Sequence, residues 1–215
     1  MIALNTIFSS LQGEGPFQGY PTLFVRLQGC NLRCNWCDTP ESQNEEAPFT
    51  LSVEEMAEKM KEQHAPHLCI TGGEPLLQTE ELIRLLTLVS DDYTTISIET
   101  NGSLPIAEIA QRVPHALFSV DLKPPSSGHD LFDTDNYTLL AQRGWLKIVV
   151  SDERDLEWIE PQLNHLASLK CEIFISPVAE NGTKWYKTVA KWTEKQGKKA
   201  PLRMQLQLHK QIGLL

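Results

Sequence analysis

Short apolar runs rich in β-branched and aromatic residues alternate along the chain with segments whose apolar positions recur at helical spacing. The apolar runs predict strands at residues 21–28, 67–71, 94–99, 116–121, 145–151 and 172–176. The amphipathic segments predict helices at residues 52–63, 79–90, 105–112, 133–142, 152–168 and 184–194, and Ser52 with Glu55 forms a capping-box pattern at the first of them. Because strands and helices alternate strictly, we expect right-handed βαβ units and a parallel sheet.

The length of the chain indicates how these units are arranged. The protein has 215 residues, whereas a closed eight-unit barrel typically needs roughly 250. Residues 203–209 alternate Met204, Leu206 and Leu208 with polar side chains, which predicts an amphipathic extra strand. The expected fold is α/β, an open (β/α)6 partial TIM barrel with an additional C-terminal strand, in a single domain spanning residues 1–215.

Polar and glycine-rich segments follow the first four predicted strands, at residues 29–39, 71–75, 99–102 and 121–125. In parallel α/β barrels, chemistry collects where strands end and loops begin. Along the third strand Ile96 and Ile98 share one face, while Ser97 and Glu99 share the other. We expect the apolar face to meet helices and the polar face to line an open, ligand-holding interior.

Composition is that of an ordinary globular protein, with 22% charged and 41% hydrophobic residues. The 19 Lys and Arg against 28 Asp and Glu give a net charge of -9, which argues against a dedicated nucleic-acid or anionic-membrane binder. No apolar run is long enough to cross a bilayer, and the first residues lack the pattern of a secretory leader. We therefore expect a cytoplasmic location, with no membrane and no nucleic acid among the partners.

Three of the five cysteines, Cys30, Cys34 and Cys37, lie within one short segment as CxxxCxxC. This spacing suits a metal site better than a disulfide framework. Zinc usually takes a fourth ligand, for which His64, His67 and Cys69 are the candidates. An iron–sulfur cluster held by three thiolates leaves one iron open for chemistry, so the cysteines alone leave both metals as alternatives. Cys69 and Cys171 fall inside apolar runs and are expected to be buried core residues.

CxxxCxxC with Trp36 before the last cysteine, followed by Gly72-Gly73-Glu74-Pro75 at the next strand end, resembles the radical S-adenosylmethionine (SAM) superfamily. The resemblance implies that Cys30, Cys34 and Cys37 hold a 4Fe–4S cluster. Its open iron would chelate SAM, and one-electron cleavage would then give an adenosyl radical that takes hydrogen from the substrate. The chain would be a single radical SAM core domain.

A closer resemblance, running nearly end to end, is to the 7-carboxy-7-deazaguanine synthase family. It rests on residues 11–15, 24–26, 28–30, 36–39 and 207–210. The family implies a carbon–nitrogen lyase that converts 6-carboxy-5,6,7,8-tetrahydropterin to 7-carboxy-7-deazaguanine with loss of ammonia, in queuosine and 7-deazapurine biosynthesis. It further implies Mg2+, a homodimer and a flavodoxin-type electron donor.

This resemblance assigns roles to individual residues. Those expected at the pterin substrate are Leu11, Gln12, Gly13, Glu14, Arg26, Thr71, Gln207 and His209. Those expected at SAM are Gly73, Glu74, Glu99, Asn101, Asp121, Leu122 and Lys123, and Thr39 is the expected Mg2+ ligand. Relatives carry Ser-Pro-Lys where this chain has Asp121, Leu122 and Lys123, so the assignment at the first two positions departs from the family pattern.

Simpler structural explanations exist for several of these residues. Residues 11–15 have the composition of a turn, and Arg26 in an apolar strand is also explained by a structural ion pair. Glu99 and Asn101 could cap the following helix. Lys147, on the fifth predicted strand, points inward or extends its ammonium group to the strand end. Lys210, next to His209, belongs to a C-terminal segment that is either a polar edge strand or a lid.

Two other functions remain open on sequence grounds. A glycyl-radical enzyme activase shares the CxxxCxxC and a similar Gly-Gly-Glu-Pro segment. A zinc-binding structural or interaction module would use the same cysteines without catalysis.

Overall fold

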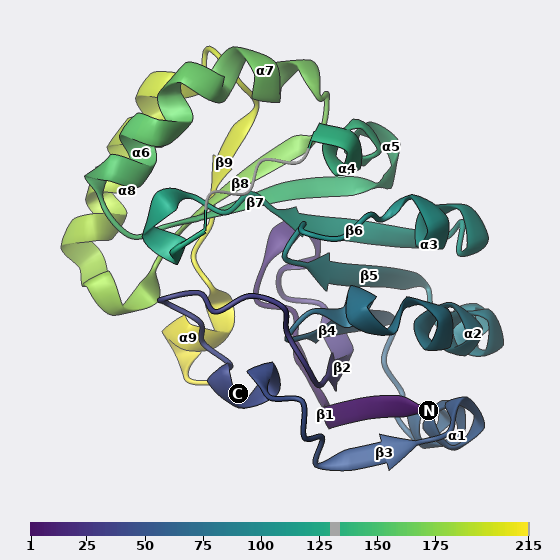
Figure 1. Ribbon diagram of the computed structural model, residues 1–215. Helices are drawn as coiled ribbons and strands as arrows, with labels where there is room; N and C mark the ends of the chain where they lie inside the picture. Colours follow the sequence, from purple (N-terminus) through teal and green to yellow (C-terminus); the bar gives the residue numbers. More distant parts are fainter. Residues whose placement is uncertain (130–133, 215) are drawn as a thin grey trace.

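The computed structural model describes residues 1–129 and 134–214. In that part of the chain, nine strands form one open sheet in the order β3-β1-β2-β4-β5-β6-β7-β8-β9 (Figure 1). Parallel pairing runs through β2 (Pro21–Leu27), β4 (His67–Gly72), β5 (Thr95–Thr100), β6 (Ala116–Asp121), β7 (Gly144–Val150), β8 (Glu172–Pro177) and β9 (Leu202–Met204). The six strands predicted from the apolar runs are confirmed, as is the open partial barrel.

Two N-terminal strands were not predicted: β1 (Ile2–Leu11) and β3 (Phe49–Leu51). They extend the sheet by antiparallel pairing, β1 with β2 and β3 with β1. Burial in β1 is confined to Ile2 and Leu4, and the register with β2 shifts between Leu4 and Thr6. An alternating apolar pattern is therefore not sustained, and no periodic signal reveals this strand.

Helices cover the convex face of the sheet (Figure 1): α1 (Val53–Lys61), α2 (Thr79–Val89), α3 (Ala107–Arg112), α6 (Glu153–Ile159), α7 (Leu163–Ser168) and α8 (Gly182–Gln196). The predicted capping box at α1 is present, with the Glu55 amide donating to Ser52 Oγ and the Ser52 amide donating to the Glu55 carboxylate. Ile98, Phe118 and Ile148 are fully buried in the core. None of the described helices is long and apolar enough to cross a membrane.

Two predicted helices are interrupted. The predicted helix at residues 152–168 is divided into α6 and α7 by a 3-10 turn, Glu160–Gln162, because Pro161 has no backbone N–H to continue the α-helical pattern. The predicted helix at residues 133–142 is represented by two short ones, α4 (Thr134–Thr138) and α5 (Leu140–Arg143), and position 133 lies outside the described residues.

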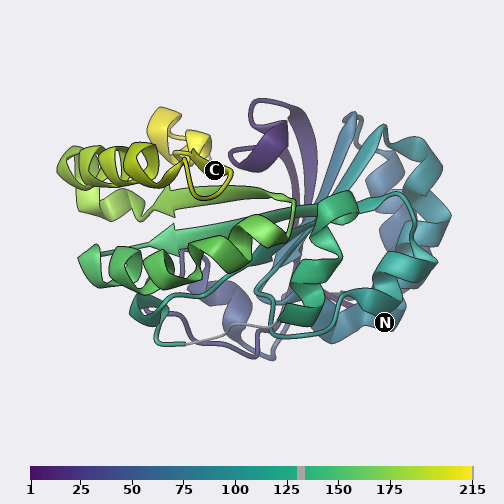
Figure 2. The same cartoon turned by 90° about the horizontal axis from the view of Figure 1, so that it is seen from above.

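The C-terminal strand predicted at residues 203–209 is wrong beyond Met204. The chain leaves the sheet there and ends in the helix α9 (Leu208–Ile212). Gln205, expected on the polar face of an edge strand, is 7% exposed. Its side chain accepts a hydrogen bond from the Gly15 amide (2.7 Å) and donates one to Ser176 Oγ (2.7 Å). These contacts turn the segment toward the loop between β1 and β2, and Figure 2 shows the two segments side by side.

The amino ends of the parallel strands are filled by side chains. His67, at the start of β4, is fully buried and hydrogen-bonded to Thr95 Oγ1 (2.6 Å) and Ser97 Oγ (3.0 Å). The Phe17 ring stacks on it with centroids 4.5 Å apart and meets Trp145 edge-on at 5.9 Å. Desolvation lowers the pKa of His67 to about 4, so the imidazole is neutral near pH 7.

Candidate active site

A cavity of about 210 Å³ lies inside the curved sheet, between the interior faces of the strands and the loops at their carboxyl ends. Its lining includes the three clustered cysteines and most residues predicted to bind substrate or cofactor: Leu11, Gln12, Glu14, Arg26, Cys30, Cys34, Cys37, Thr39, Thr71, Gly73, Glu99, Asn101, Asp121, Lys123, Gln207 and His209. These residues come from both ends of the chain and from four parallel strands or the loops that follow them. The predicted polar interior is therefore confirmed.

The cysteine loop, residues 30–37, follows β2. Its start is held by backbone hydrogen bonds, from the Gly29 amide to the Ser42 carbonyl (2.8 Å) and from the Glu74 amide to the Gly29 carbonyl (2.8 Å). The Leu32 amide donates to Cys30 Sγ at 3.4 Å, and Asn101 Nδ2 lies 3.9 Å from the same sulfur. Both donors are therefore directed at the sulfur of a predicted cluster ligand.

The arrangement of these cysteines fits a multi-iron cluster better than a single ion. Among the described residues, no three His, Cys, Asp or Glu side chains converge as the ligands of one zinc ion would. An iron–sulfur cluster held by three thiolates leaves one iron open, and all three cysteines line the cavity. Burial raises the pKa of the Cys34 thiol and Lys123 opposes that shift. Iron coordination would remove the cost of ionising the thiol there.

Two of the three zinc ligands considered from the sequence, His67 and Cys69, are engaged elsewhere, and His64 is exposed and does not line the cavity. His67 is hydrogen-bonded at the opposite end of the barrel, and Cys69 Sγ lies 3.5 Å from Glu99 Oε1. Cys69 is fully buried and Cys171 is 6% exposed, which confirms the prediction that both are core residues.

The Gly72-Gly73-Glu74-Pro75 turn after β4 is packed against the cysteine loop. A Cβ added at Gly73 would lie 2.2 Å from the Gly29 carbonyl oxygen and 2.6 Å from that of Ser42. Both contacts are to backbone, so a side chain there would displace the chain leading into the cysteines. Glycine at this position therefore has a structural role, because it lets the turn pack against the backbone that leads into the cysteines.

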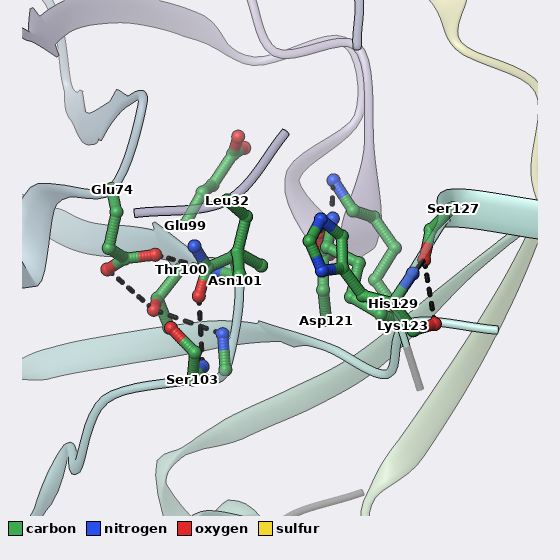
Figure 3. Close-up of polar contacts among 12 residues, drawn as sticks. Leu32, Glu74, Glu99, Thr100, Asn101, Ser103, Asp121, Lys123, Ser127 and His129 are labelled. Carbon is green, nitrogen blue, oxygen red and sulfur yellow. Dashed lines mark hydrogen bonds and ion pairs between the residues drawn. The ribbon is translucent and has the colours of Figure 1, made fainter. Parts of the chain in front are cut away.

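Glu74 links this turn to the end of β5 (Figure 3). The fully buried carboxylate accepts hydrogen bonds from Thr100 Oγ1 (2.8 Å), the Asn101 amide (2.7 Å) and the Leu76 amide (3.0 Å). Desolvation raises the pKa of Glu74 to about 6, although these donors favour the ionised form. Its side chain does not line the cavity, and it joins the ends of two neighbouring strands.

A network of charged side chains crosses the interior. Lys147 Nζ lies 3.2 Å from Glu14 Oε2 and 3.5 Å from Asp121 Oδ1, and Lys123 Nζ lies 2.5 Å from Asp121 Oδ2. Burial would lower the pKa of Lys147, but Asp121 and Glu14 raise it well above its ordinary value. Burial would likewise raise the pKa of Asp121, but Lys123 and Lys147 lower it. The two lysines are therefore cations and Asp121 an anion near neutral pH.

Glu99 is the acid of the interior face of β5. It accepts hydrogen bonds from Gln12 Nε2 (3.3 Å) and Thr71 Oγ1 (3.2 Å). Burial raises the pKa of Glu99, and the charge of Lys147 opposes the shift. The side chain thus points into the cavity and does not cap the following helix.

Arg26 lies on β2 and lines the cavity beside two aromatic rings. Its guanidinium carbon is 5.9 Å from the centroid of the Phe8 ring, which stacks on Phe24 at 5.0 Å. Among the described residues, no side-chain carboxylate or other acceptor pairs with this guanidinium. A structural ion pair therefore does not explain this arginine, and its five donors are available to an anionic ligand.

The two ends of the chain meet over one side of the cavity. The Leu208 amide donates to the Gly13 carbonyl (3.0 Å), and Gln207 Nε2 donates to Glu14 Oε1 (2.7 Å). A Cβ at Gly13 would lie 2.0 Å from His209 Nδ1, so the imidazole packs directly on the glycine. The C-terminal segment therefore covers the β1–β2 loop as a lid and is not an edge strand.

Thr39 and its neighbours form the rim of the cavity. Thr39 Oγ1 is 3.2 Å from Asp38 Oδ1, and Lys210 Nζ lies 3.4 Å from Asp38 Oδ2 and 3.5 Å from Glu180 Oε1. The hydroxyl and carboxylate of this pair are oxygen donors of the kind that Mg2+ prefers. Lys210, on α9, thus contacts the segment that follows the cysteine loop and the β8–α8 loop at this rim.

Three of the predicted site residues do not line the cavity: Gly13, Glu74 and Leu122. Leu122 is 1% exposed, and its amide donates to the Lys147 carbonyl (2.8 Å). The SAM contacts expected of Leu122 and Glu74 remain predictions, and the backbone of these residues would have to make them.

Several cavity residues were not assigned a role from the sequence. Lys147 was left open between two orientations, and the ion pairs with Glu14 and Asp121 show that it points inward. Phe8 belongs to the unpredicted strand β1, and Phe24 resembles any core aromatic of an apolar run. Their shared position beside Arg26 has no local sequence signal.

Comparison with known proteins places these features in context. Residues 24–127 match the model of the Radical SAM superfamily. A 7-carboxy-7-deazaguanine synthase of Methanospirillum hungatei is 40% identical over 211 residues, covering 97% of this chain and 84% of the relative. One from Chlorobaculum tepidum is 38% identical over 216 residues, covering 97% of this chain and 93% of the relative.

Solved structures show the same fold. The crystal structure of QueE from Escherichia coli superposes with a TM-score of 0.74 at 24% identity, covering 97% of this chain and 94% of that one. Streptococcus suis SuiB bound to S-adenosylmethionine superposes with a TM-score of 0.59 at 15% identity, covering 83% of this chain and 48% of that one. At these identities the likeness concerns the fold alone.

Proposed function

The chain belongs to the 7-carboxy-7-deazaguanine synthase family of radical SAM enzymes, and from this premise we propose that it converts 6-carboxy-5,6,7,8-tetrahydropterin to 7-carboxy-7-deazaguanine with loss of ammonia. This reaction would place it in queuosine and related 7-deazapurine biosynthesis. The observation that carries the proposal is that one cavity holds both the cysteine loop and the unpaired guanidinium of Arg26.

Cys30, Cys34 and Cys37 would hold the 4Fe–4S cluster of the family at one end of this cavity. When bound, the cluster and SAM supply the radical that takes a hydrogen from C6 of the pterin. The protein's own contribution is to place the C6 hydrogen near that radical source and to keep water out.

Arg26 would bind the pterin carboxylate through two parallel hydrogen bonds. The stacked Phe8 and Phe24 rings, which also line the cavity, would add apolar contacts to the heterocycle. Gln12 and Thr71 would meet the donor and acceptor edge of the pterin. Both donate hydrogen bonds to Glu99, which the sequence placed at SAM, so we propose this carboxylate as a contact of the pterin instead.

SAM would lie over the Gly73 turn, whose backbone lines the cavity and packs against the chain that leads into the cysteines. Asn101 and Lys123 supply an amide and a cation from the ends of the neighbouring strands, and the Asp121 carboxylate pairs with Lys123. Leu122 would contribute its backbone. We assign these residues to SAM on the basis of the family resemblance and their position beside the cysteines.

Thr39 would be a ligand of Mg2+ that also binds the substrate carboxylate. A single hydroxyl suits this ion, which retains several waters and takes few protein ligands. Gly13, Gln207 and His209 would complete the substrate side of the cavity and shield it from solvent.

The family resemblance also supports a homodimer, a flavodoxin-type electron donor and a cytoplasmic location as proposals. Light scattering tests the first, and reduction of the cluster by a purified flavodoxin tests the second.

The central experiment is anaerobic incubation of the iron–sulfur-reconstituted protein with SAM, dithionite, Mg2+ and 6-carboxytetrahydropterin. We expect 7-carboxy-7-deazaguanine and ammonia in equal amounts, detected by mass spectrometry. No product from a protein that holds an intact cluster would refute the proposed function.

Two matched cysteine variants make the same experiment specific. Cys34→Ala should lose most of its iron and all turnover, whereas Cys171→Ala should keep both because Cys171 lies in the core. If metal analysis of the wild-type protein found zinc in place of iron and no acid-labile sulfide, a structural zinc site would be supported instead.

A further inference from the structure

Trp36, which lines the cavity between Cys34 and Cys37, is tied to a segment outside the cysteine loop. Its indole Nε1 donates a hydrogen bond to Ser126 Oγ at 3.1 Å. Ser126 lies in the 3-10 turn Pro125–Ser127 that follows β6. The orientation of an aromatic cavity wall is therefore set by a serine that is not itself among the cavity residues.

Ser126 is in turn held by Asp155, a fully buried carboxylate of α6. Asp155 accepts hydrogen bonds from Ser126 Oγ (2.5 Å), the Ser126 amide (3.0 Å) and the Ser151 amide (2.7 Å). An indole N–H only donates and a carboxylate only accepts, so the single hydroxyl proton of Ser126 must point to Asp155. The relay from Trp36 to Asp155 thus has one direction, and each bond polarises the next.

Backbone contacts bring the same two segments together. The Asn35 amide donates to the Ser127 carbonyl (3.0 Å), and Asn35 Nδ2 donates to the Ser126 carbonyl (3.1 Å). A Cβ at Gly128 would lie 3.2 Å from Asn35 Nδ2, and Gly128 also has a positive φ of 84°. The cysteine loop therefore docks on the turn independently of the indole, and the Trp36–Ser126 bond adds orientation to a contact that already exists.

The indole transmits this orientation to a cation of the cavity. Lys123 Nζ lies 4.9 Å from the centroid of the Trp36 ring, in a cation–π contact, and the residue is 6% exposed. A rotated indole would remove this contact and move its edge into the space beside Cys34 and Cys37. We propose that Ser126, held by Asp155, is a positioning residue that fixes Trp36, and through it Lys123, for the binding of SAM.

This inference rests on the proposed function, and its test measures ligand binding separately from turnover. Equilibrium binding of SAM to the anaerobically reconstituted protein should weaken roughly three- to tenfold in Ser126→Ala, the value of one hydrogen bond lost at a partly buried site. Ser126→Thr keeps the hydroxyl and should restore the affinity. Iron content should match the wild type in both variants, since the backbone contacts of the turn remain. The unfolding midpoint should fall only in Ser126→Ala, which leaves the buried Asp155 carboxylate with one donor fewer.

A second pair of variants tests whether Ser126 acts through the indole. Trp36→Phe removes the donor and should also weaken SAM binding, and Ser126→Ala should then cause no further loss in the Trp36→Phe background. Ser168→Ala, which removes an exposed hydroxyl bonded to the His165 carbonyl, is the control and should bind as the wild type does.

Unchanged SAM affinity in Ser126→Ala, or full additivity with Trp36→Phe, would overturn the positioning role. Wild-type protein that binds SAM but does not turn over the pterin would overturn the proposed function alone, because the binding comparison would still stand.

Discussion

Lys147 Nζ on β7 forms an ion pair with Glu14 Oε2 in the β1–β2 loop, at 3.2 Å. The two side chains are 13% and 12% exposed, and they join the parallel part of the sheet to the loop that the C-terminal segment covers. A charged contact inside the cavity therefore holds the substrate side of the site in place.

Replacing Lys147 by Met should leave Glu14 and Asp121 without this cation. Breaking a largely buried ion pair costs about 3 kcal/mol, because an uncompensated charge remains. We expect a loss of that order in urea unfolding. Lys61→Met, which breaks the exposed pair of Lys61 with Glu58, is the matched control and should change stability by less than about 1 kcal/mol. Equal losses of stability in the two variants would show that the Lys147–Glu14 pair stabilises the fold no more than an exposed pair does.

Arg26→Lys should affect catalysis without affecting stability. No described acceptor pairs with the guanidinium, so little is lost from the fold, whereas a lysine cannot form two parallel bonds with a carboxylate. We expect kcat/KM for the carboxytetrahydropterin to fall by about 10- to 100-fold. SAM affinity and the unfolding midpoint should not change. A stability loss without a catalytic one would indicate that Arg26 is a structural residue.

Glu74 should give the protein a distinct pH dependence. Its pKa is raised to about 6 in the fold, mainly by desolvation, so the folded state binds a proton more tightly than the unfolded chain does. The tighter proton binding stabilises the folded state by about 2 kcal/mol. This stabilisation is fully present below the ordinary pKa of 4.5 and is lost as the pH rises through about 6. The free energy of unfolding of wild type minus that of Glu74→Gln should therefore decrease between pH 4.5 and 6.

Glu74→Gln should be less stable than the wild type over this whole pH range. The glutamine side chain has an NH2 group in place of one carboxylate oxygen, so either Thr100 Oγ1 or the Asn101 amide loses its acceptor. A stability difference that does not vary with pH would show that Glu74 has an ordinary pKa in the fold.

Gly13→Ala should displace His209, since the new Cβ would lie 2.0 Å from Nδ1 of the imidazole. The obstacle is a side chain, so we expect a higher KM for the pterin and a small effect on stability. Adding His209→Ala should relieve the clash and recover part of the pterin affinity, unless His209 itself contacts the substrate.

Gly73→Ala, whose Cβ meets backbone carbonyls, should instead lower the iron content, and no second substitution of a side chain should restore it.

The predictable part of the site follows from the parallel strands. Apolar runs define β2, β4, β5 and β6, and the polar segments after them contain Cys30, Gly73, Asn101 and Lys123. Parallel strands bring their carboxyl ends to one edge, so residues that follow successive strands meet regardless of the loops between them. Successive side chains of a strand point to opposite faces of the sheet, so the alternation of Ser97 and Glu99 with isoleucines correctly predicted the interior face of β5.

The sequence by itself thus determined the parallel sheet, its polar interior and the cysteine loop, because these depend on local periodicity and spacing. Only the tertiary structure decided that Lys147 pairs with Glu14, that Ser126 and Asp155 hold Trp36, and that residues 205–209 leave the sheet to cover the β1–β2 loop. These contacts join segments far apart in the chain through single polar side chains. Their partners are fixed by how the sheet curves, which no periodic pattern in the sequence records.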